Sequence, residues 1–141
     1  MRMQWAWIST VLMAVFLAPS AHAQYALTPS TQATAFLGTW VIEMTQPAAF
    51  KGTHTVTISD NNGALTANVQ TGNSPPKPVT GIVKDGEMLV LTISRESPSA
   101  MRENGVPIWA VYSLTLNGDT MKAALMLEPS DTIKKGMGRK Q

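Results

Sequence analysis

The chain has 141 residues, of which 44% are hydrophobic and 14% are charged, and its formal net charge is +2 at pH 7. It contains no cysteine, which excludes disulfides and a lipid-modified cysteine, so a packed core must supply its stability. The sequence has no basic stripe interleaved with aromatic residues, which argues against a nucleic-acid partner.

The first 23 residues have the pattern of a secretory signal peptide. Arg2 supplies a positive n-region, residues 5–17 are almost wholly apolar, and Ala21-His22-Ala23 is a small-x-small cleavage site. The apolar run is about a dozen residues, whereas a membrane-spanning helix needs roughly 20. We therefore expect cleavage after Ala23 and a soluble protein in the periplasm or outside the cell; the alternative is an uncleaved anchor.

The remaining chain is expected to form one domain. Residues 24–35 are rich in Thr, Ser, Pro and Ala without a clear period, and are interpreted as an exposed leader. From Phe36 to the end, apolar residues alternate with polar ones and turn residues recur about every ten residues, which is typical of all-β folds. Residues 36–141 are therefore predicted to form a single antiparallel up-and-down β-barrel of about eight strands.

Alternation within each run predicts which side chains face the interior. Parity also predicts that Lys135 faces inward, which is rare for an unpaired lysine. Either the last strand is shifted by a bulge, or Lys135 lies near the mouth. The residues predicted to face inward, run by run, are Trp40, Ile42 and Met44; His54, Val56 and Ile58; Leu65, Ala67 and Val69; Val79, Gly81 and Val83; Leu89, Leu91 and Ile93; Ile108, Ala110, Tyr112, Leu114 and Leu116; Met121, Ala123, Leu125 and Leu127; and Ile133, Lys135, Met137 and Arg139.

The connections between these runs alternate between long and short. In an up-and-down barrel successive connections fall at opposite ends, so tight hairpins would close one end and long loops would surround the other as a mouth. This is the shape of a container. The tight joints are Asp60-Asn61-Asn62-Gly63, Lys84-Asp85-Gly86 and Asn117-Gly118-Asp119, and the long ones are residues 46–52, 71–78 and 94–107.

Two features resemble the lipocalin (calycin) superfamily: Gly38-Thr39-Trp40 opens the first strand and Arg139 closes the last. The chain is also similar to small secreted bacterial lipocalin-like proteins of unassigned function, over residues 36–139. The resemblance implies that Trp40 lies at the closed end and that the Arg139 guanidinium packs across its indole, a contact worth about 0.5–2 kcal/mol. The chain departs from many lipocalins in having no disulfide and no long C-terminal helix. The alternative is an ordinary core tryptophan with a solvated terminal arginine.

Two polar side chains are candidates for ligand contacts. His54 is the single histidine left after cleavage, and it is predicted to face inward near the long-loop mouth, where an imidazole can bind a ligand or move a proton. Tyr112 is predicted to face inward in the middle of the barrel, where its hydroxyl needs a partner. A satisfied or rim-exposed His54 is the alternative. A zinc site would need two or more carboxylates, and none cluster at ligand spacing, so neither a metal nor a cofactor is expected.

The leading hypothesis is an exported barrel that binds a small, largely apolar molecule at its long-loop end. One alternative is a protein-binding or inhibitory module that uses Phe50 and Met101 on the loop rim. A further alternative is a small enzyme using His54 and Tyr112, although no nucleophile elbow, phosphate loop or dinucleotide fingerprint supports it. In the leading hypothesis His54 or Tyr112 orients a polar end of the ligand, and its body is buried against Ile42, Met44, Val56, Leu91, Ile108 and Met121.

Overall fold

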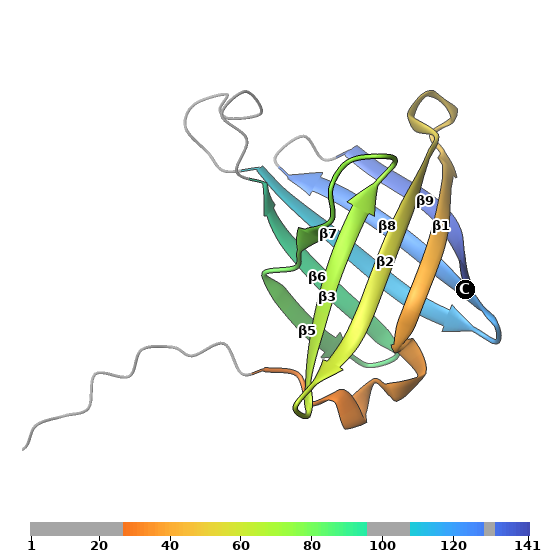
Figure 1. Ribbon diagram of the computed structural model, residues 1–141. Coiled ribbons are helices and arrows are strands. Elements are labelled where there is room, and N and C mark those ends of the chain that lie inside the picture. The colour runs from red at the N-terminus through yellow and green to blue at the C-terminus, as the bar shows by residue number, and fades with distance from the viewer. Residues whose placement is uncertain (1–26, 96–107, 129–131) are drawn as a thin grey trace, which may run out of the picture.

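The protein is built around one antiparallel sheet of nine strands. The computed structural model describes residues 27–95, 108–128 and 132–141. The strand order is β4-β3-β2-β1-β9-β8-β7-β6-β5, and the sheet curls into a half-barrel (Figure 1). The predicted all-β, antiparallel, up-and-down architecture is confirmed. The strands are β1 (Gly38–Gln46), β2 (Gly52–Asn61), β3 (Ala64–Thr71), β4 (Lys77–Pro78), β5 (Gly81–Asp85), β6 (Met88–Arg95), β7 (Ile108–Asn117), β8 (Thr120–Glu128) and β9 (Thr132–Lys140), and the 3-10 helices are η1 (Ser30–Gln32), η2 (Thr34–Phe36) and η3 (Ala48–Phe50).

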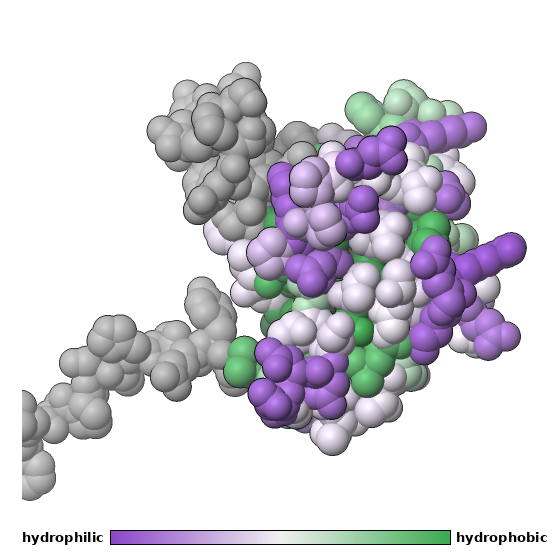
Figure 2. All heavy atoms as spheres, in the orientation of Figure 1, coloured by the Kyte–Doolittle hydropathy of each residue, from purple (hydrophilic) through white to green (hydrophobic). Residues whose placement is uncertain are grey.

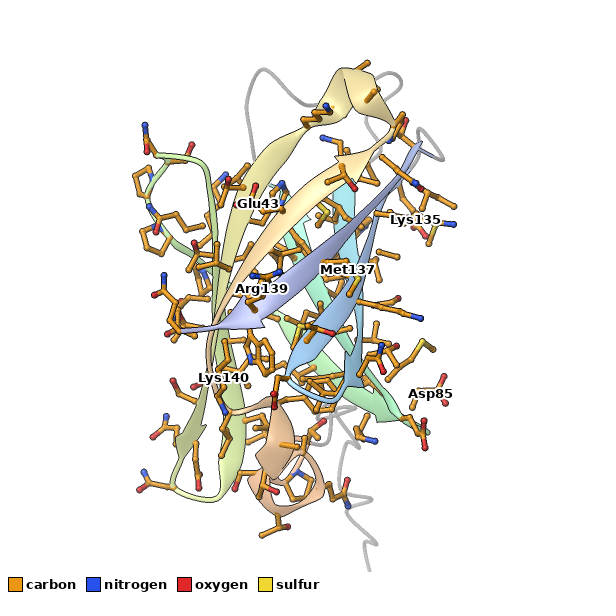
Figure 3. All side chains as sticks on the ribbon, turned by 90° about the vertical axis from the view of Figure 1, so that its right-hand side faces the viewer. Glu43, Asp85, Lys135, Met137, Arg139 and Lys140 are labelled. Atoms are coloured by element: carbon orange, nitrogen blue, oxygen red, sulfur yellow. The ribbon has the colours of Figure 1, made fainter. Side chains whose placement is uncertain are left out.

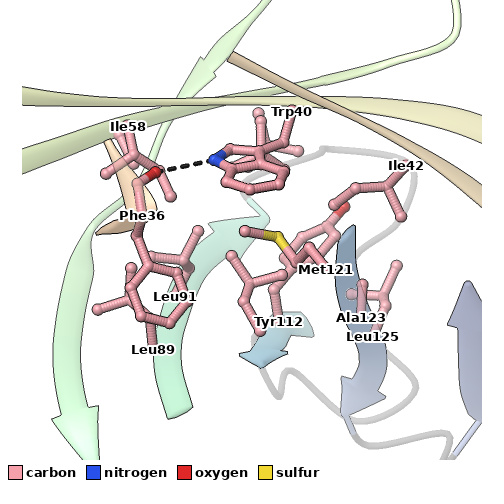
Figure 4. Close-up of a cluster of buried hydrophobic side chains, with 14 of the residues drawn as sticks. Phe36, Trp40, Ile42, Ile58, Leu89, Leu91, Tyr112, Met121, Ala123 and Leu125 are labelled. Atoms are coloured by element: carbon pink, nitrogen blue, oxygen red, sulfur yellow. Dashed lines mark hydrogen bonds between the residues drawn. The ribbon is translucent and has the colours of Figure 1, made fainter. Parts of the chain in front are cut away.

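The interior of the curled sheet is a packed apolar core (Figure 4). It forms because alternate side chains of each strand point to the same face, and six strands follow the parity that the sequence predicts. None of the helices in the described part has the length and apolar character needed to cross a bilayer. The buried residues that follow the predicted parity are Trp40, Ile42 and Met44; His54, Val56 and Ile58; Leu65, Ala67 and Val69; Leu89, Leu91 and Ile93; Ala110, Tyr112 and Leu114; and Met121, Ala123 and Leu125.

The predicted fourth strand is split into β4 and β5, which pair with different neighbours. The Val79 N–H donates to the Ala67 carbonyl of β3 (2.9 Å), and the next N–H, of Thr80, donates to the Thr92 carbonyl of β6 (2.8 Å). This crossing reverses the side-chain parity, so Ile82 packs against the core while Val83 is 59% exposed. The prediction that Val83 faces inward was therefore wrong, and the described residues form nine strands where about eight were expected.

The parity of β9 is the reverse of the prediction. Ile133 and Met137 are 50% and 45% exposed, and Lys135 and Arg139 are exposed as well. A Cβ added at Gly136 would lie 2.3 Å from the Glu43 carbonyl oxygen, so glycine occupies this close approach. The shifted-strand alternative for Lys135 does not account for this parity: β9 pairs with β8 without interruption from Thr132 to Arg139, and the irregularity in the β1–β9 register lies between Met44 and Gln46 of β1.

The two ends of the sheet differ as the connections predict. The turn between β2 and β3 has positive φ at Asn62 (53°) and Gly63 (87°), which is typical of a tight type I′ hairpin. The longer connections at 47–51 and 72–76 lie together at the opposite end (top of Figure 1). Only residues 94–107 of the predicted long loops fall mostly outside the described residues.

The tight-turn end is covered by the segment before β1. Thr28, Ser30, Ala33 and Phe36 are buried there, so residues 28–35 are not the exposed leader that the sequence suggested. The Leu65 N–H donates to the Thr28 carbonyl (3.0 Å), and the Thr28 hydroxyl donates to the Ile82 carbonyl (2.6 Å). Thr28 therefore bridges β3 and β5, the two strands that flank the opening of the sheet, which we call the seam.

Candidate functional site

A cavity of about 180 Å³ lies inside the sheet at the long-loop end. It is bounded by β2, β3 and β4 on one side and by β6, β7, β8 and β9 on the other. Apolar and polar side chains contribute to it together. The lining residues are His54, Val69, Thr71, Ser74, Pro75, Lys77, Ile93, Ala110, Tyr112, Leu125, Leu127 and Lys134.

A buried histidine–tyrosine pair contributes the inner polar groups of this cavity. His54 Nδ1 lies 2.8 Å from the Tyr112 hydroxyl, and the rings meet edge to face with centroids 5.8 Å apart. The two side chains are only 4% and 2% exposed. Both side chains face inward, as the sequence predicts. Their contact was not predicted, because alternation within one strand says nothing about which residue of another strand, here 58 positions away, lies beside it. The hydrogen bond supplies the partner that a buried tyrosine hydroxyl needs.

Two lysines contribute to the lining of the cavity. Lys77 comes from β4 and Lys134 from β9, and the lining contributed by residues 27–95, 108–128 and 132–141 includes no Asp or Glu. The Lys134 ammonium lies 5.0 Å from the centre of the Phe50 ring, which is half exposed at the same end. A site lined by cations without counter-charges attracts anions. The sequence analysis did not single out either lysine; the reversed parity of β9 is what brings Lys134 to the cavity.

The apolar residues predicted to contact a ligand lie elsewhere. Their side chains are at most 1% exposed, and none of them lines the cavity. They form the packed core, so a ligand of the cavity would not contact them. These residues are Ile42, Met44, Val56, Leu91 and Met121; the side chain of Ile108 and the rim residue Met101 fall outside the described part of the structure.

The predicted barrel-closing pair was Trp40 and Arg139, and the structure gives Trp40 a different cationic neighbour. The Trp40 indole is buried and donates its Nε1–H to the Phe36 carbonyl at 2.8 Å (Figure 4). The cation beside it is Lys140, whose Nζ lies 5.5 Å from the ring centre. Arg139 is exposed because its neighbour Gly138 faces the core. The predicted role of Arg139 is thus corrected to Lys140.

Comparison of this chain with family models, with curated proteins and with solved structures finds no match. Among the described residues, no three or more His, Cys, Asp or Glu side chains lie close enough to hold a metal ion. The site offers polar and basic binding groups at the end of an apolar core.

Proposed function

We propose that the protein binds a small organic acid in the cavity at its long-loop end. The observation that carries this proposal is the combination of a buried His54–Tyr112 hydrogen bond with two lysines that line the cavity. The ligand's carboxylate lies between Lys77 and Lys134, and its apolar body contacts the aliphatic walls. The ligand is held without covalent chemistry.

The size of the cavity limits the ligand. A cavity of about 150 Å³ is known to hold benzene, so the 180 Å³ found here suits one six-membered ring or a short chain. A second polar group at the far end of the ligand would lie beside the His54–Tyr112 hydrogen bond. A hydroxylated aromatic acid has all three features, and 4-hydroxybenzoate is a suitable probe.

The container requires the curled sheet to act as a closed, lipocalin-like barrel. Closure across the seam is supported by the backbone hydrogen bonds of Val79 and Thr80, which reach β3 and β6 respectively. The Thr28 hydroxyl adds a third connection, to Ile82 of β5. These contacts hold both flanks together, so that side chains rather than water fill the interior.

Titration calorimetry with 4-hydroxybenzoate tests this proposal. We expect Lys77→Met and Lys134→Met each to weaken binding several-fold, because each removes one cation beside the carboxylate. Tyr112→Phe is expected to weaken binding by about 0.5–1.5 kcal/mol, the net contribution of one hydrogen bond. Lys51→Met is the matched control, because Lys51 is exposed at the same end and does not line the cavity.

A neutral analogue distinguishes ligand binding in the cavity from selectivity for an anion. If 4-hydroxybenzyl alcohol binds as tightly as the acid, the cavity is a ligand site without anion selectivity. If neither compound binds and a panel of short-chain and aromatic acids also fails, the proposed function is wrong.

A further inference from the structure

A half-exposed phenylalanine stands at the long-loop end, beside the cavity. Phe50 is the last residue of η3, in the connection between β1 and β2, and its N–H donates to the Pro47 carbonyl at 2.9 Å. The side chain is 50% exposed and is not part of the core cluster. In Figure 2 this connection forms the green projection at the top right. Core packing therefore does not account for an aromatic ring at this position.

The ring of Phe50 lies against one of the two lysines that line the cavity. Figure 3 faces the outer side of β9, where Lys135 and Met137 are labelled. Lys134 has the opposite parity and pairs with Leu125 of β8, and both residues line the cavity. The Lys134 ammonium is 5.0 Å from the centre of the Phe50 ring. At this distance the negative face of the ring attracts the cation.

The two cavity lysines therefore differ in how they are held. Lys77 is exposed on β4, and no aromatic ring of the described residues lies over it. A lysine side chain loses much rotamer freedom when a ligand fixes it. A cation that is already held near the site loses less of this freedom on binding. Because an ammonium has three N–H donors, Lys134 can face the ring on one side and a carboxylate on another.

We propose that Phe50 is a positioning residue that makes the cavity selective for acids, because its ring holds the Lys134 ammonium at the mouth. This inference rests on the proposed function, in which the carboxylate of the ligand lies between the two lysines. Phe50 does not line the cavity, so it acts on the ligand through Lys134. Its contribution is to the binding of the anionic group, and the apolar body of the ligand is bound without it.

Titration calorimetry with an acid and its neutral analogue tests this role. We expect Phe50→Leu to weaken binding of 4-hydroxybenzoate about two- to fivefold, the range of an exposed cation–π contact, and to leave binding of 4-hydroxybenzyl alcohol unchanged. Phe50→Tyr keeps an aromatic face and should bind the acid like the unmodified protein. In a Lys134→Met background Phe50→Leu should have no further effect, whereas in the matched Lys77→Met background its full effect should remain.

Proton NMR of the ligand-free protein tests the contact itself. The ring current of Phe50 should move the ε-methylene protons of Lys134 upfield, and Phe50→Leu should abolish this shift. An unshifted Lys134 signal in the unmodified protein would overturn the inference.

The binding data contain two further results that would overturn it. One is an equal loss of acid and alcohol binding in Phe50→Leu, which would mean that Phe50 contacts the body of the ligand. The other is an acid affinity that Phe50→Leu does not change, which would refute the role of Phe50 and leave the proposed function standing. If the unmodified protein binds no acid, the proposed function fails and this inference fails with it.

Discussion

The Trp40 indole lies at the tight-turn end of the sheet and makes three kinds of contact. Its Nε1–H donates to the Phe36 carbonyl, its ring lies in the core, and the Lys140 ammonium lies beside it. Gly38 makes the last contact possible: its φ is +122°, and a Cβ there would lie 2.6 Å from Lys140 Cε. The glycine of the Gly-x-Trp motif thus has a local physical role in this chain.

Substitutions at these positions should show that Lys140, and not Arg139, contributes to stability through Trp40. We expect Trp40→Ala to lower the free energy of unfolding by about 3–5 kcal/mol, as for other buried aromatic residues. Lys140→Ala should lower it by about 0.5–1 kcal/mol through lost packing on the indole. Arg139→Ala is the control and should stay within about 0.5 kcal/mol, since its side chain is on the outer surface. Urea titration checks this, and a larger loss for Arg139→Ala than for Lys140→Ala would contradict it.

The residues of β9 that face the core include two glycines, Gly136 and Gly138. β9 lies between β1 and β8, and Gly136 and Gly138 have the inward parity in both registers. A Cβ at Gly138 would lie 2.9 Å from Ile42 Cγ1, so the strand packs closely because it has no inward side chains there. The interior is filled by the large residues of the neighbouring strands.

Alanine at these glycines should therefore destabilise the protein by overpacking. We expect Gly136→Ala to lower the free energy of unfolding by about 1–3 kcal/mol or more, because its Cβ would meet backbone atoms of β1 that cannot move aside. Gly52→Ala is the matched control, since it also lies on a strand, has no positive φ, and has open space around its Cβ position. Equal melting temperatures for the two variants would contradict this account.

Sequence alternation predicts a strand well when its apolar residues fill one face. This holds for β1, β2, β3, β6, β7 and β8. It fails for β9, where Ile133, Met137 and two basic residues are outside while Lys134 and two glycines have the inward parity, because pattern reading assigns the larger apolar side chains to the core. It fails again at Val83, because the change of partner strand at Thr80 is set by tertiary pairing. For the same reason, only two of the eight residues predicted to contact a ligand, His54 and Tyr112, are among the residues that line the cavity.

At the scale of the whole molecule, the sheet is continuous everywhere except at the seam between β3 and β5. β5 pairs on one side alone, with β6, while β9 pairs on both sides. The seam is bridged by few groups, among them the Thr28 hydroxyl, which reaches across 54 residues of sequence. Edge strands with few hydrogen bonds open at lower free energy than central ones.

Hydrogen exchange should report this difference. We expect amides of Gly81–Asp85 to exchange faster than those of Thr132–Lys140, although the second segment is at the chain terminus. Thr28→Val, which removes the hydroxyl but keeps the shape, should speed exchange in β5 by about two- to tenfold, corresponding to one hydrogen bond of about 0.5–1.5 kcal/mol. Thr66→Val, at an exposed position of β3, is the control. Mass spectrometry of peptic peptides checks both, and unchanged β5 exchange in Thr28→Val would contradict the bridging role.

The central place of β9 also has a consequence for how the chain folds. Trp40 pairs with Lys140, so the middle of the sheet joins residues one hundred positions apart in the sequence. Until the last strand is available, β1 and β8 both present open edges that can pair with other chains. Pairings of such long range form slowly compared with local hairpins. A nascent chain can therefore build its hairpins early, but it completes its sheet only after residues 132–140 have been made.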